Sequence, residues 1–356
     1  MYNCTLKMLN IFKQSFFIVF FLFSTSLFSQ ICGTPGGDGP ITVSSSVNTY
    51  YPIAGDITLN AGGQSIKLAA VPKMDAHKND FGTTPISVGD LILIIQMQDA
   101  TIDYRNNNNY GSGTSNSGPD LLGGTGFTDI GNTGIFEYVI ATNNVPLSGG
   151  NLTFKGTAVN GGTSNSYFNA EAAGSRGKRT FQIVRVPQYS NLTLTKDITT
   201  PPFNGIAGGV IAFNVSGNFN FGNFSINGTA RGFRGGYSPK ADSGINDSTT
   251  YVGEAANQTI SGKGEGIAGT PKFMWDGYNE VNNGVEGMPV GSSGRGAPAN
   301  AGGGGNDHNS GGGGGGNGGF GGLGGYGWQG GGGVQWSQAN IQNTGAGRPG
   351  FKSYCT

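Results

Sequence analysis

A glycine-rich tract at residues 301–333 constrains this chain more than any other feature of its sequence. Of the 32 residues from 302 to 333, 21 are glycine. In the middle of the tract, two glycines are followed every third residue by a larger side chain: Asn317, Phe320, Leu323 and Tyr326. A period of three fits neither an α-helix nor a β-strand, but it matches a left-handed extended helix with three residues per turn. The tract therefore predicts a polyglycine-II-like segment.

The same tract is open to two interpretations. A three-residue helix forms no internal hydrogen bonds, so neighbouring segments or water must pair its amides. Composition alone favours a flexible linker. The regular phase of the apolar residues favours a packed segment, in which the glycine edges let other backbones approach closely. Neither interpretation gives the tract any enzyme chemistry.

The composition of the rest of the chain is typical of an extracellular β-protein. Only 11% of the residues are charged, against roughly 25% in ordinary soluble domains. Without the first 30 residues, the chain has 18 basic and 20 acidic side chains, which gives a net charge of −2. This balance offers no electrostatic footprint for nucleic acid or for an anionic membrane. We therefore expect no nucleic-acid partner.

Residues 1–30 have the pattern of a secretory signal peptide. Two lysines precede an apolar run at residues 16–23, and small residues follow it up to Ser29-Gln30, where we expect cleavage. The apolar run is too short to span a bilayer. No later stretch is apolar enough to do so, and we therefore expect no membrane span after signal removal. The chain is predicted to be secreted or held at the cell surface, and the periplasm stays open because no sorting domain is seen.

Two cysteines remain after signal removal, one near each end of the chain, Cys32 and Cys355. In an oxidising compartment they are a candidate disulfide, if the two ends meet. The chain-entropy model gives such a bridge a stabilisation of roughly 5 kcal/mol, because it closes nearly the whole chain.

Residues 31–200 are predicted to form a small β-barrel or β-sandwich. The clearest strand is 88–98, whose continuous apolar run with β-branched residues indicates burial on both faces. Alternating residues on either side of a Gly-Gly turn predict a hairpin of 56–59 with 65–68. Further short β-prone runs are bounded by Gly, Pro or Asn; they are 135–140, 151–154, 181–186 and 192–194.

From residue 201 to 356 the pattern changes to that of a parallel β-solenoid. Alternating apolar residues in 211–215, then in 219–221 and 224–226, are separated by Gly and Asn corners, as in one coil of a solenoid. Residues 237–301 lack periodicity and are expected to form a long excursion. The glycine tract then follows. The predicted architecture is thus all-β, with a barrel or sandwich followed by a solenoid-like, glycine-rich domain.

The chain resembles the large glycine-rich secreted proteins of gliding bacteria, often labelled adventurous gliding motility proteins, with Bacteroidetes-type relatives. The resemblance rests on the order of the glycine tract and of five earlier segments, 88–98, 182–189, 208–213, 232–236 and 264–269. It implies a surface protein and carries over no catalytic residue. Members usually continue beyond the tract, whereas this chain stops at Thr356, as a short paralogue or a truncated reading frame would.

Motifs for enzyme chemistry are weak throughout the chain. Gly264, Gly266 and Gly269 spell a dinucleotide fingerprint, but no strand precedes them and no helix follows, so a turn is expected. His77 and His308 are the only histidines, with no second ligand at metal spacing. The polar loop 103–129 lacks the spacing of a calcium loop. We expect no catalytic, cofactor-binding or metal-binding residues.

The predicted function is a non-enzymatic structural or adhesive module of the cell surface, linked through the resemblance to gliding motility or attachment. Its partner would be a surface glycan or another envelope component. Four aromatic residues are candidate contacts: Trp275, Tyr278, Tyr326 and Trp328. The alternative is a carbohydrate-active enzyme or a glycan-binding module on a β-helix. An enzyme requires clustered carboxylates, and the candidates are Asp242, Asp247, Glu254, Glu265, Asp276 and Glu280.

Overall fold

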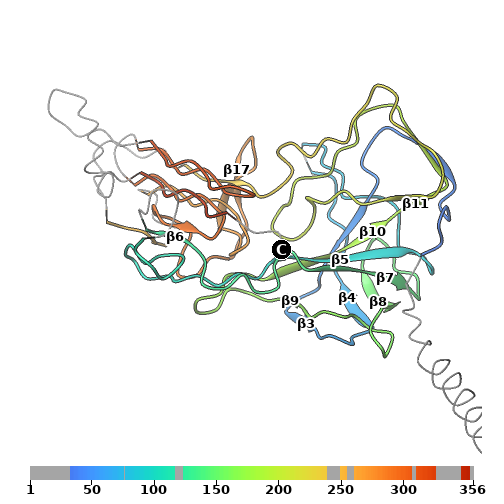
Figure 1. The fold of residues 1–356 in the computed structure, drawn as a ribbon, viewed down its shortest axis with the longest axis horizontal. Helices are drawn as coiled ribbons and strands as arrows, with labels where there is room; N and C mark the ends of the chain where they lie inside the picture. Colours follow the sequence, from blue (N-terminus) through green and yellow to red (C-terminus); the bar gives the residue numbers. More distant parts are fainter. Residues whose placement is uncertain are drawn as a thin grey trace, which may run out of the picture. The chain divides into compact units, whose positions relative to one another are not determined.

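The computed structural model describes residues 33–75, 77–116, 123–238, 249–254, 260–306, 310–325 and 346–352 (Figure 1). These residues form strands and irregular segments without a helix, which confirms the predicted all-β class. The described part of the chain accordingly holds no helix able to cross a bilayer. Several predicted features lie outside the described residues, namely the signal peptide, Cys32, Asp242, Asp247, His308, Tyr326, Trp328 and Cys355.

The largest element is a six-stranded antiparallel sheet shaped as a half-barrel. Its order is β2-β10-β5-β7-β8-β4, so strands from distant parts of the sequence lie side by side. The bounds are β2 (Thr49–Pro52), β10 (Thr180–Val186), β5 (Leu91–Gln98), β7 (Phe136–Ala141), β8 (Gly150–Lys155) and β4 (Ser65–Leu68).

Strand β5 occupies a central position in this sheet and is buried on both faces, as its apolar run predicts. Ile92 and Ile94 belong to the core cluster on one side, together with Val139 of β7. Leu91 and Leu93 belong to a second cluster on the other side. Successive side chains of a strand point to opposite faces, so a strand covered on both faces is apolar along most of its length. The two buried glutamines near its end, Gln96 and Gln98, are satisfied by donating to the carbonyls of Phe168 and Gly266.

The predicted hairpin of 56–59 with 65–68 is wrong. Strand β3 (Ile57–Leu59) pairs with β9 (Tyr167–Asn169), while β4 pairs with β8. The turn between them is bonded to a distant loop instead, because Gly62 donates to the Thr163 carbonyl at 2.7 Å and Thr163 donates to Gly63 at 2.9 Å. A Gly-Gly turn between alternating runs indicates a reversal of the chain, but it does not determine the pairing.

Parallel pairing joins short strands on both sides of residue 200. Strand β12 (Asn191–Leu194) lies between β1 (Pro40–Val43) and β14 (Phe219–Asn220), and β11 (Gln188–Tyr189) pairs with β13 (Asn214–Val215). A single bridge, Ile198 with Ile226, continues this layer. The described residues show no solenoid, since the stacking does not repeat beyond these layers.

The remaining described strands form two small sheets. One has the order β15-β16-β17, with bounds Gly235–Gly236, Phe273–Trp275 and Glu280–Asn282. The other joins β6 (Thr125–Gly126) to β18 (Ala297–Pro298) in parallel.

The described glycine segments are paired to one another in a three-residue rhythm. Gly313 and Gly316 donate to the carbonyls of Gly303 and Asn300 at 2.8 and 2.7 Å. Gly321 and Gly324 donate to Gly350 and Gly347 at 2.9 and 3.0 Å. In a helix with three residues per turn, every third N–H group points to the same side, where a neighbouring segment must accept it. Over residues 302–306 and 310–325, the tract is thus bonded into the protein, as the packed interpretation predicts.

Candidate functional site

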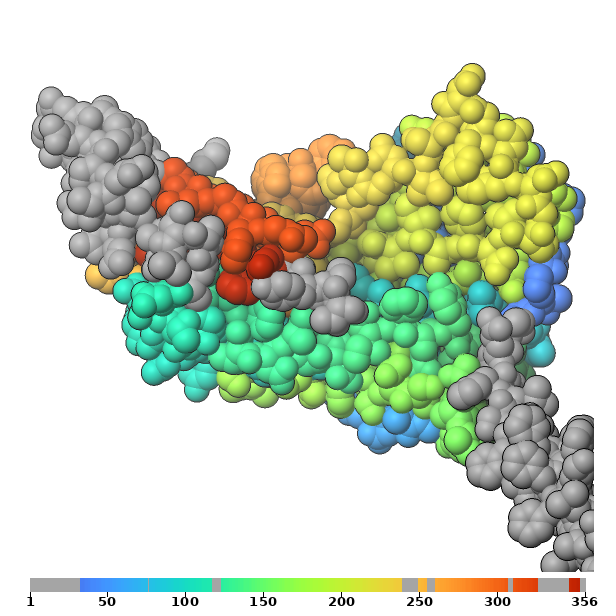
Figure 2. Space-filling view, in the orientation of Figure 1, coloured from blue at the N-terminus to red at the C-terminus, as the bar shows by residue number. Residues whose placement is uncertain are grey.

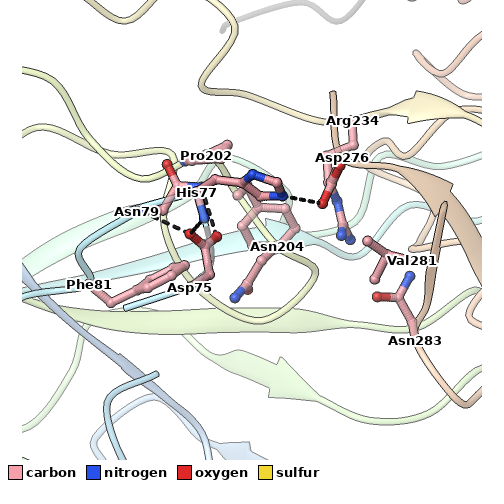
Figure 3. A pocket seen from close by; sticks show the side chains of 11 residues that line it. Asp75, His77, Asn79, Phe81, Pro202, Asn204, Arg234, Asp276, Val281 and Asn283 are labelled. Atoms are coloured by element: carbon pink, nitrogen blue, oxygen red, sulfur yellow. Dashed lines mark hydrogen bonds and ion pairs between the residues drawn. The ribbon is translucent and has the colours of Figure 1, made fainter. Parts of the chain in front are cut away.

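A cleft of about 390 Å³ opens beside the β16–β17 hairpin (Figure 3). Its lining comes from three distant stretches of sequence, a loop at 75–81, a loop at 202–204 and the small sheet that carries the hairpin. The lining is mixed in character, with apolar, amide and ionisable side chains: Asp75, His77, Asn79, Phe81, Pro202, Phe203, Asn204, Arg234, Asp276, Val281 and Asn283.

The hairpin turn is built around the carboxylate of Asp276. One of its oxygens accepts the backbone N–H groups of Tyr278 and Asn279, at 2.8 and 2.7 Å. Gly277, which lies between Asp276 and Tyr278, has a φ of 101°, a conformation that glycine adopts without strain. An aspartate that bonds the amides two and three residues ahead is a common way to fix a tight turn. The turn therefore holds Tyr278 in a defined place at the rim of the cleft.

The loop on the opposite side presents His77 to this turn. Its Nε2 lies 3.1 Å from Oδ2 of Asp276, and its ring stacks on the ring of Tyr278 with centroids 4.1 Å apart and planes 12° apart. Asp75 orders the loop by accepting the backbone N–H groups of His77 and Asn79, both at 2.9 Å. Two loops 199 residues apart in sequence are thereby joined across the cleft.

The pKa of Asp276 is lowered by its hydrogen-bond partners. Partial burial on its own would raise this pKa, but the amides of Asn279 and Tyr278 together with His77 outweigh burial and lower it from the ordinary 3.8. Since each of these partners favours the ionised form, Asp276 carries a negative charge at neutral pH.

We expect Asp276→Asn to reduce stability at neutral pH and to have progressively less effect in acid. A lowered folded-state pKa contributes stability above the ordinary value of 3.8, and this contribution is lost as the pH falls through the lowered pKa. The loss at neutral pH is expected to be below about 1 kcal/mol, because the pair is partly exposed to solvent. Thermal melts of both proteins between about pH 7 and pH 2 measure the difference. Asp56→Asn, at an exposed position, is the control; a difference independent of pH contradicts the charge argument.

The positive charge of Arg234 is neutralised behind the cleft. Its Nε and Nη2 donate to the two oxygens of Glu265, both at 3.0 Å, and the Glu265 side chain is fully buried. Thr270 donates to the same carboxylate at 2.8 Å. Asp75 and Asp276 are the remaining carboxylates of the lining, and the guanidinium of Arg231 lies beside it, donating to Asn79 at 3.2 Å. The cleft therefore has a small excess of negative charge when His77 is neutral.

Two of the four aromatic residues singled out in the sequence lie on the β16–β17 hairpin, on either side of Asp276, although neither is part of the cleft lining. Trp275 ends β16 and is 44% exposed, and Tyr278 in the turn is 66% exposed. Of the candidate carboxylates that the structure describes, Asp276 lines the cleft, Glu265 is buried behind it, and Glu254 and Glu280 are absent from the lining. Asp75, Asn79, Asn204, Arg234 and Asn283 were not singled out from the sequence, since none of them stands in a motif.

Two other polar regions serve the structure rather than a ligand. The Gly264–Gly269 stretch is a tight turn closed by a Gly266–Gly269 bridge, and the side chain of Asn300 accepts the N–H of Ile267 inside it.

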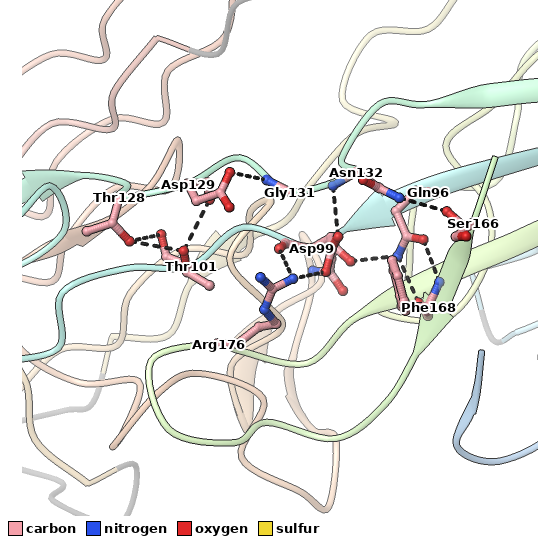
Figure 4. A network of polar contacts seen from close by, with 11 residues as sticks. Gln96, Asp99, Thr101, Thr128, Asp129, Gly131, Asn132, Ser166, Phe168 and Arg176 are labelled. Carbon is pink, nitrogen blue, oxygen red and sulfur yellow. Dashed lines mark hydrogen bonds and ion pairs between the residues drawn. The ribbon is translucent and has the colours of Figure 1, made fainter. Parts of the chain in front are cut away.

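The second region lies at the end of β5, where Asp99 accepts hydrogen bonds from Nη1 of Arg176 at 2.5 Å and from the N–H of Asn132 at 2.8 Å (Figure 4). Among the described residues there is no cluster of three His, Cys, Asp or Glu side chains placed to hold a metal ion.

No protein-family model matches this chain, and neither the curated proteins nor the solved structures contain a significant match to it.

Proposed function

We propose that this protein is a non-enzymatic attachment module, secreted or held at the cell surface, that binds a glycan in the cleft beside the β16–β17 hairpin. The observation that supports it most is the placement of Tyr278. Its ring is 66% exposed, yet the stacked His77 ring and the Asp276 turn hold it in position. A rigid, exposed aromatic ring beside amide and carboxylate groups supplies both an apolar face and hydrogen-bonding partners for a sugar.

The charge of the cleft favours a neutral glycan. Asp75 and Asp276 face the cavity, while the charge of Arg234 is matched by Glu265. An anionic ligand, whether a polyuronate or a nucleic acid, would meet repulsion rather than the basic surface that such ligands require. Asn204 and Asn283 add one polar atom each: the oxygen of Asn204 and the nitrogen of Asn283 bond to the backbone, so Nδ2 of Asn204 can donate to a sugar hydroxyl and Oδ1 of Asn283 can accept from one.

The alternative function, a carbohydrate-active enzyme, has less support. Glycoside hydrolysis uses a pair of carboxyl groups, one of which must be protonated to act as the acid. Asp276 has a lowered pKa and accepts three N–H groups, which suits an ionised structural carboxylate. Asp75 likewise accepts the two loop amides and the side chain of Asn79. Neither group is arranged as a proton donor.

The glycine segments fit this proposal as a scaffold. We propose that they form a polyglycine-II-like bundle within a glycine-rich C-terminal domain, 201–356, which follows a barrel-type domain, 31–200. The three-residue hydrogen-bond rhythm supports the bundle, while the proposed boundary at residue 200 rests on the change of sequence pattern there. Export rests on the signal-like N-terminus. A role in gliding motility or surface attachment rests on the resemblance of the sequence, and an envelope component other than a glycan is the remaining partner class.

A binding experiment with the two exposed aromatic residues tests the proposal. The mature protein is expected to bind a neutral polysaccharide and to bind a polyuronate more weakly, as measured by titration calorimetry or a glycan array. Tyr278→Ala and Trp275→Ala are each expected to weaken binding by roughly 2- to 12-fold, the range that loss of one aromatic contact produces. Tyr138→Ala removes an exposed ring from β7 of the half-barrel and is the control. Binding unaffected by both cleft variants would refute the proposed site.

A further inference from the structure

The parallel layers end at residues 213–228, which present an open strand edge. On the inner side, Asn214 and Ser216 donate to the carbonyls of Pro187 and Tyr189, at 2.9 and 3.0 Å. Leu192 donates to Asn218 at 2.9 Å, and Ile198 exchanges bonds with the residues on either side of Ile226. This stretch belongs to the yellow region of Figure 1, close to β11.

The outer side of the same stretch has main-chain groups that point away from these partners. In a parallel ladder, alternate residues bond to one neighbour and the residues between them bond to the other. Because the residues on either side of them bond inward, Val215, Phe219 and Ile226 direct their N–H and C=O groups outward. Among the described strands, β13 and β14 have no partner on that side.

The side chains along this edge are apolar and uncharged. Phe221, Phe224 and Ile226 are 45, 39 and 42% exposed, and the yellow atoms of Figure 2 show the region at the surface. From residue 213 to 228 the sequence contains asparagine, glycine and serine between the apolar residues, but no Lys, Arg, Asp, Glu or Pro. Natural proteins usually protect edge strands with charge or proline, and an unprotected apolar edge marks a site of strand pairing.

The opposite edge of the same stack is protected. On β1, Gly39 and Val43 accept bonds from the β12 side, at 2.9 and 3.0 Å, so the alternation places Pro40 and Thr42 on the outer edge. Proline has no N–H to donate and is a common device for blocking edge pairing. Head-to-tail stacking of β14 on the β1 edge of another molecule is therefore disfavoured, and the open edge must have a different partner.

We propose that the edge at residues 213–228 pairs with the same edge of a second copy of this chain, forming a two-fold symmetric dimer. A two-fold axis brings the two edges together antiparallel, which is the geometry that joins two open edges with the same direction. Residues close to the two-fold axis face their own copies, so an uncharged edge such as this one avoids like-charge repulsion there. The dimer presents two glycan clefts, but it does not depend on the function proposed for them.

Sedimentation velocity of the mature protein over a range of concentrations tests this proposal. Wild type is expected to form dimers, and Phe221→Lys is expected to weaken dimerisation by roughly 100-fold or more, because it removes an exposed apolar side chain from the edge and puts a like charge on both copies of the interface. Asn223→Lys adds a charge at an exposed position of the same rim without removing an apolar group, and it is expected to act in the same direction. Phe136→Lys, at an apolar position 57% exposed on β7, is expected to leave the dimer intact.

Three outcomes would overturn the proposal. A wild-type protein that stays monomeric to sub-millimolar concentration shows that the edge does not pair with itself. Association that grows without limit shows head-to-tail stacking rather than a closed dimer. A dimer that persists in both Phe221→Lys and Asn223→Lys, each folded by circular dichroism, places the interface elsewhere.

Discussion

Gly303→Ala is expected to destabilise the protein by about 3 kcal/mol or more, at the upper end of what overpacking costs. A Cβ on Gly303 would lie 2.0 Å from the carbonyl oxygen of Arg295, far inside van der Waals contact. The obstructing atom belongs to the backbone of an adjacent segment that is itself hydrogen-bonded, so no side-chain rotation can relieve the contact. The melting temperature of the variant, measured by calorimetry, is expected to fall by several degrees.

Gly322→Ala is the matched control for this effect. Gly322 lies in the same set of segments and accepts the N–H of Gly314 at 2.8 Å, but a Cβ there would meet nothing within 4 Å. Neither glycine has a positive φ, so alanine brings no backbone strain at either position. If both variants melt together with wild type, the glycines serve flexibility and the packed interpretation is wrong.

Hydrogen exchange gives a second readout of the same prediction. The amides of Gly313 and Gly316 donate to described carbonyls and are expected to exchange slowly. Those of Gly312 and Gly315 donate to no described backbone group and are expected to exchange faster. In Gly303→Ala the protection at Gly313 is expected to be lost, because its acceptor is the carbonyl of residue 303. Weak protection throughout this stretch would contradict the bundle in wild type as well.

The three-residue period predicts the conformation of the glycine tract, but it does not predict which segments pack against the tract. Two glycines before each larger side chain indicate an extended helix with edges that admit another backbone. The segments that fill those edges include Ser261, Arg295 and Arg348, which stand in stretches without a sustained three-residue repeat. Some partner positions also require glycine, since a Cβ on Gly347 would lie 2.3 Å from the Gly303 carbonyl oxygen, but isolated glycines do not indicate which segment they contact.

In the half-barrel, too, the sequence predicted the burial of a strand but not its pairing partners. The apolar run of β5 predicted a strand buried on both faces because a strand covered on both faces needs apolar side chains at consecutive positions. The pairing of β3 with β9 and of β4 with β8 joins segments about 100 residues apart in the chain. Alternation in a strand determines which face is buried, but it contains nothing about which strand lies next to it.

At the cleft, the sequence identified the exposed aromatic residues but not their surroundings. Trp275 and Tyr278 stand out in an aperiodic stretch, and Asp276 was one of several scattered carboxylates. His77 lies in a loop 199 residues earlier, and only the folded chain brings its ring onto Tyr278. The aspartates and asparagines that complete the site also serve as turn residues, so their types are equally typical of an ordinary loop.

Lys263→Met is expected to destabilise the protein by about 3 kcal/mol, the size of effect seen when a buried polar partner is removed. Lys263 is fully buried, and its Nζ donates to the carbonyl oxygens of Tyr251, Gly294 and Gly296 at 2.5, 3.0 and 2.6 Å. The three donors of an ammonium group match three acceptors that belong to the backbone. Methionine has a similar length and no donor, so all three carbonyls lose this partner inside the protein.

One contribution opposes this loss. Burial lowers the pKa of Lys263 well below its ordinary value, although the negative charge of Glu286 counteracts part of the shift, and methionine removes that desolvation cost. We expect the lost hydrogen bonds to dominate. The carbonyls of Tyr251 and Gly294 keep the N–H groups of Gly296 and Gly304, but the Gly296 carbonyl keeps no described backbone donor, and an unsatisfied buried acceptor costs about 1–3 kcal/mol. The variant also loses the contact of Nζ with the Tyr110 ring, whose centroid lies 4.5 Å away. Lys155→Met changes an exposed lysine and is the control in denaturant unfolding. If Lys263→Met is as stable as Lys155→Met, desolvation of the amine balances the three hydrogen bonds, and Lys263 does not hold these backbone segments together.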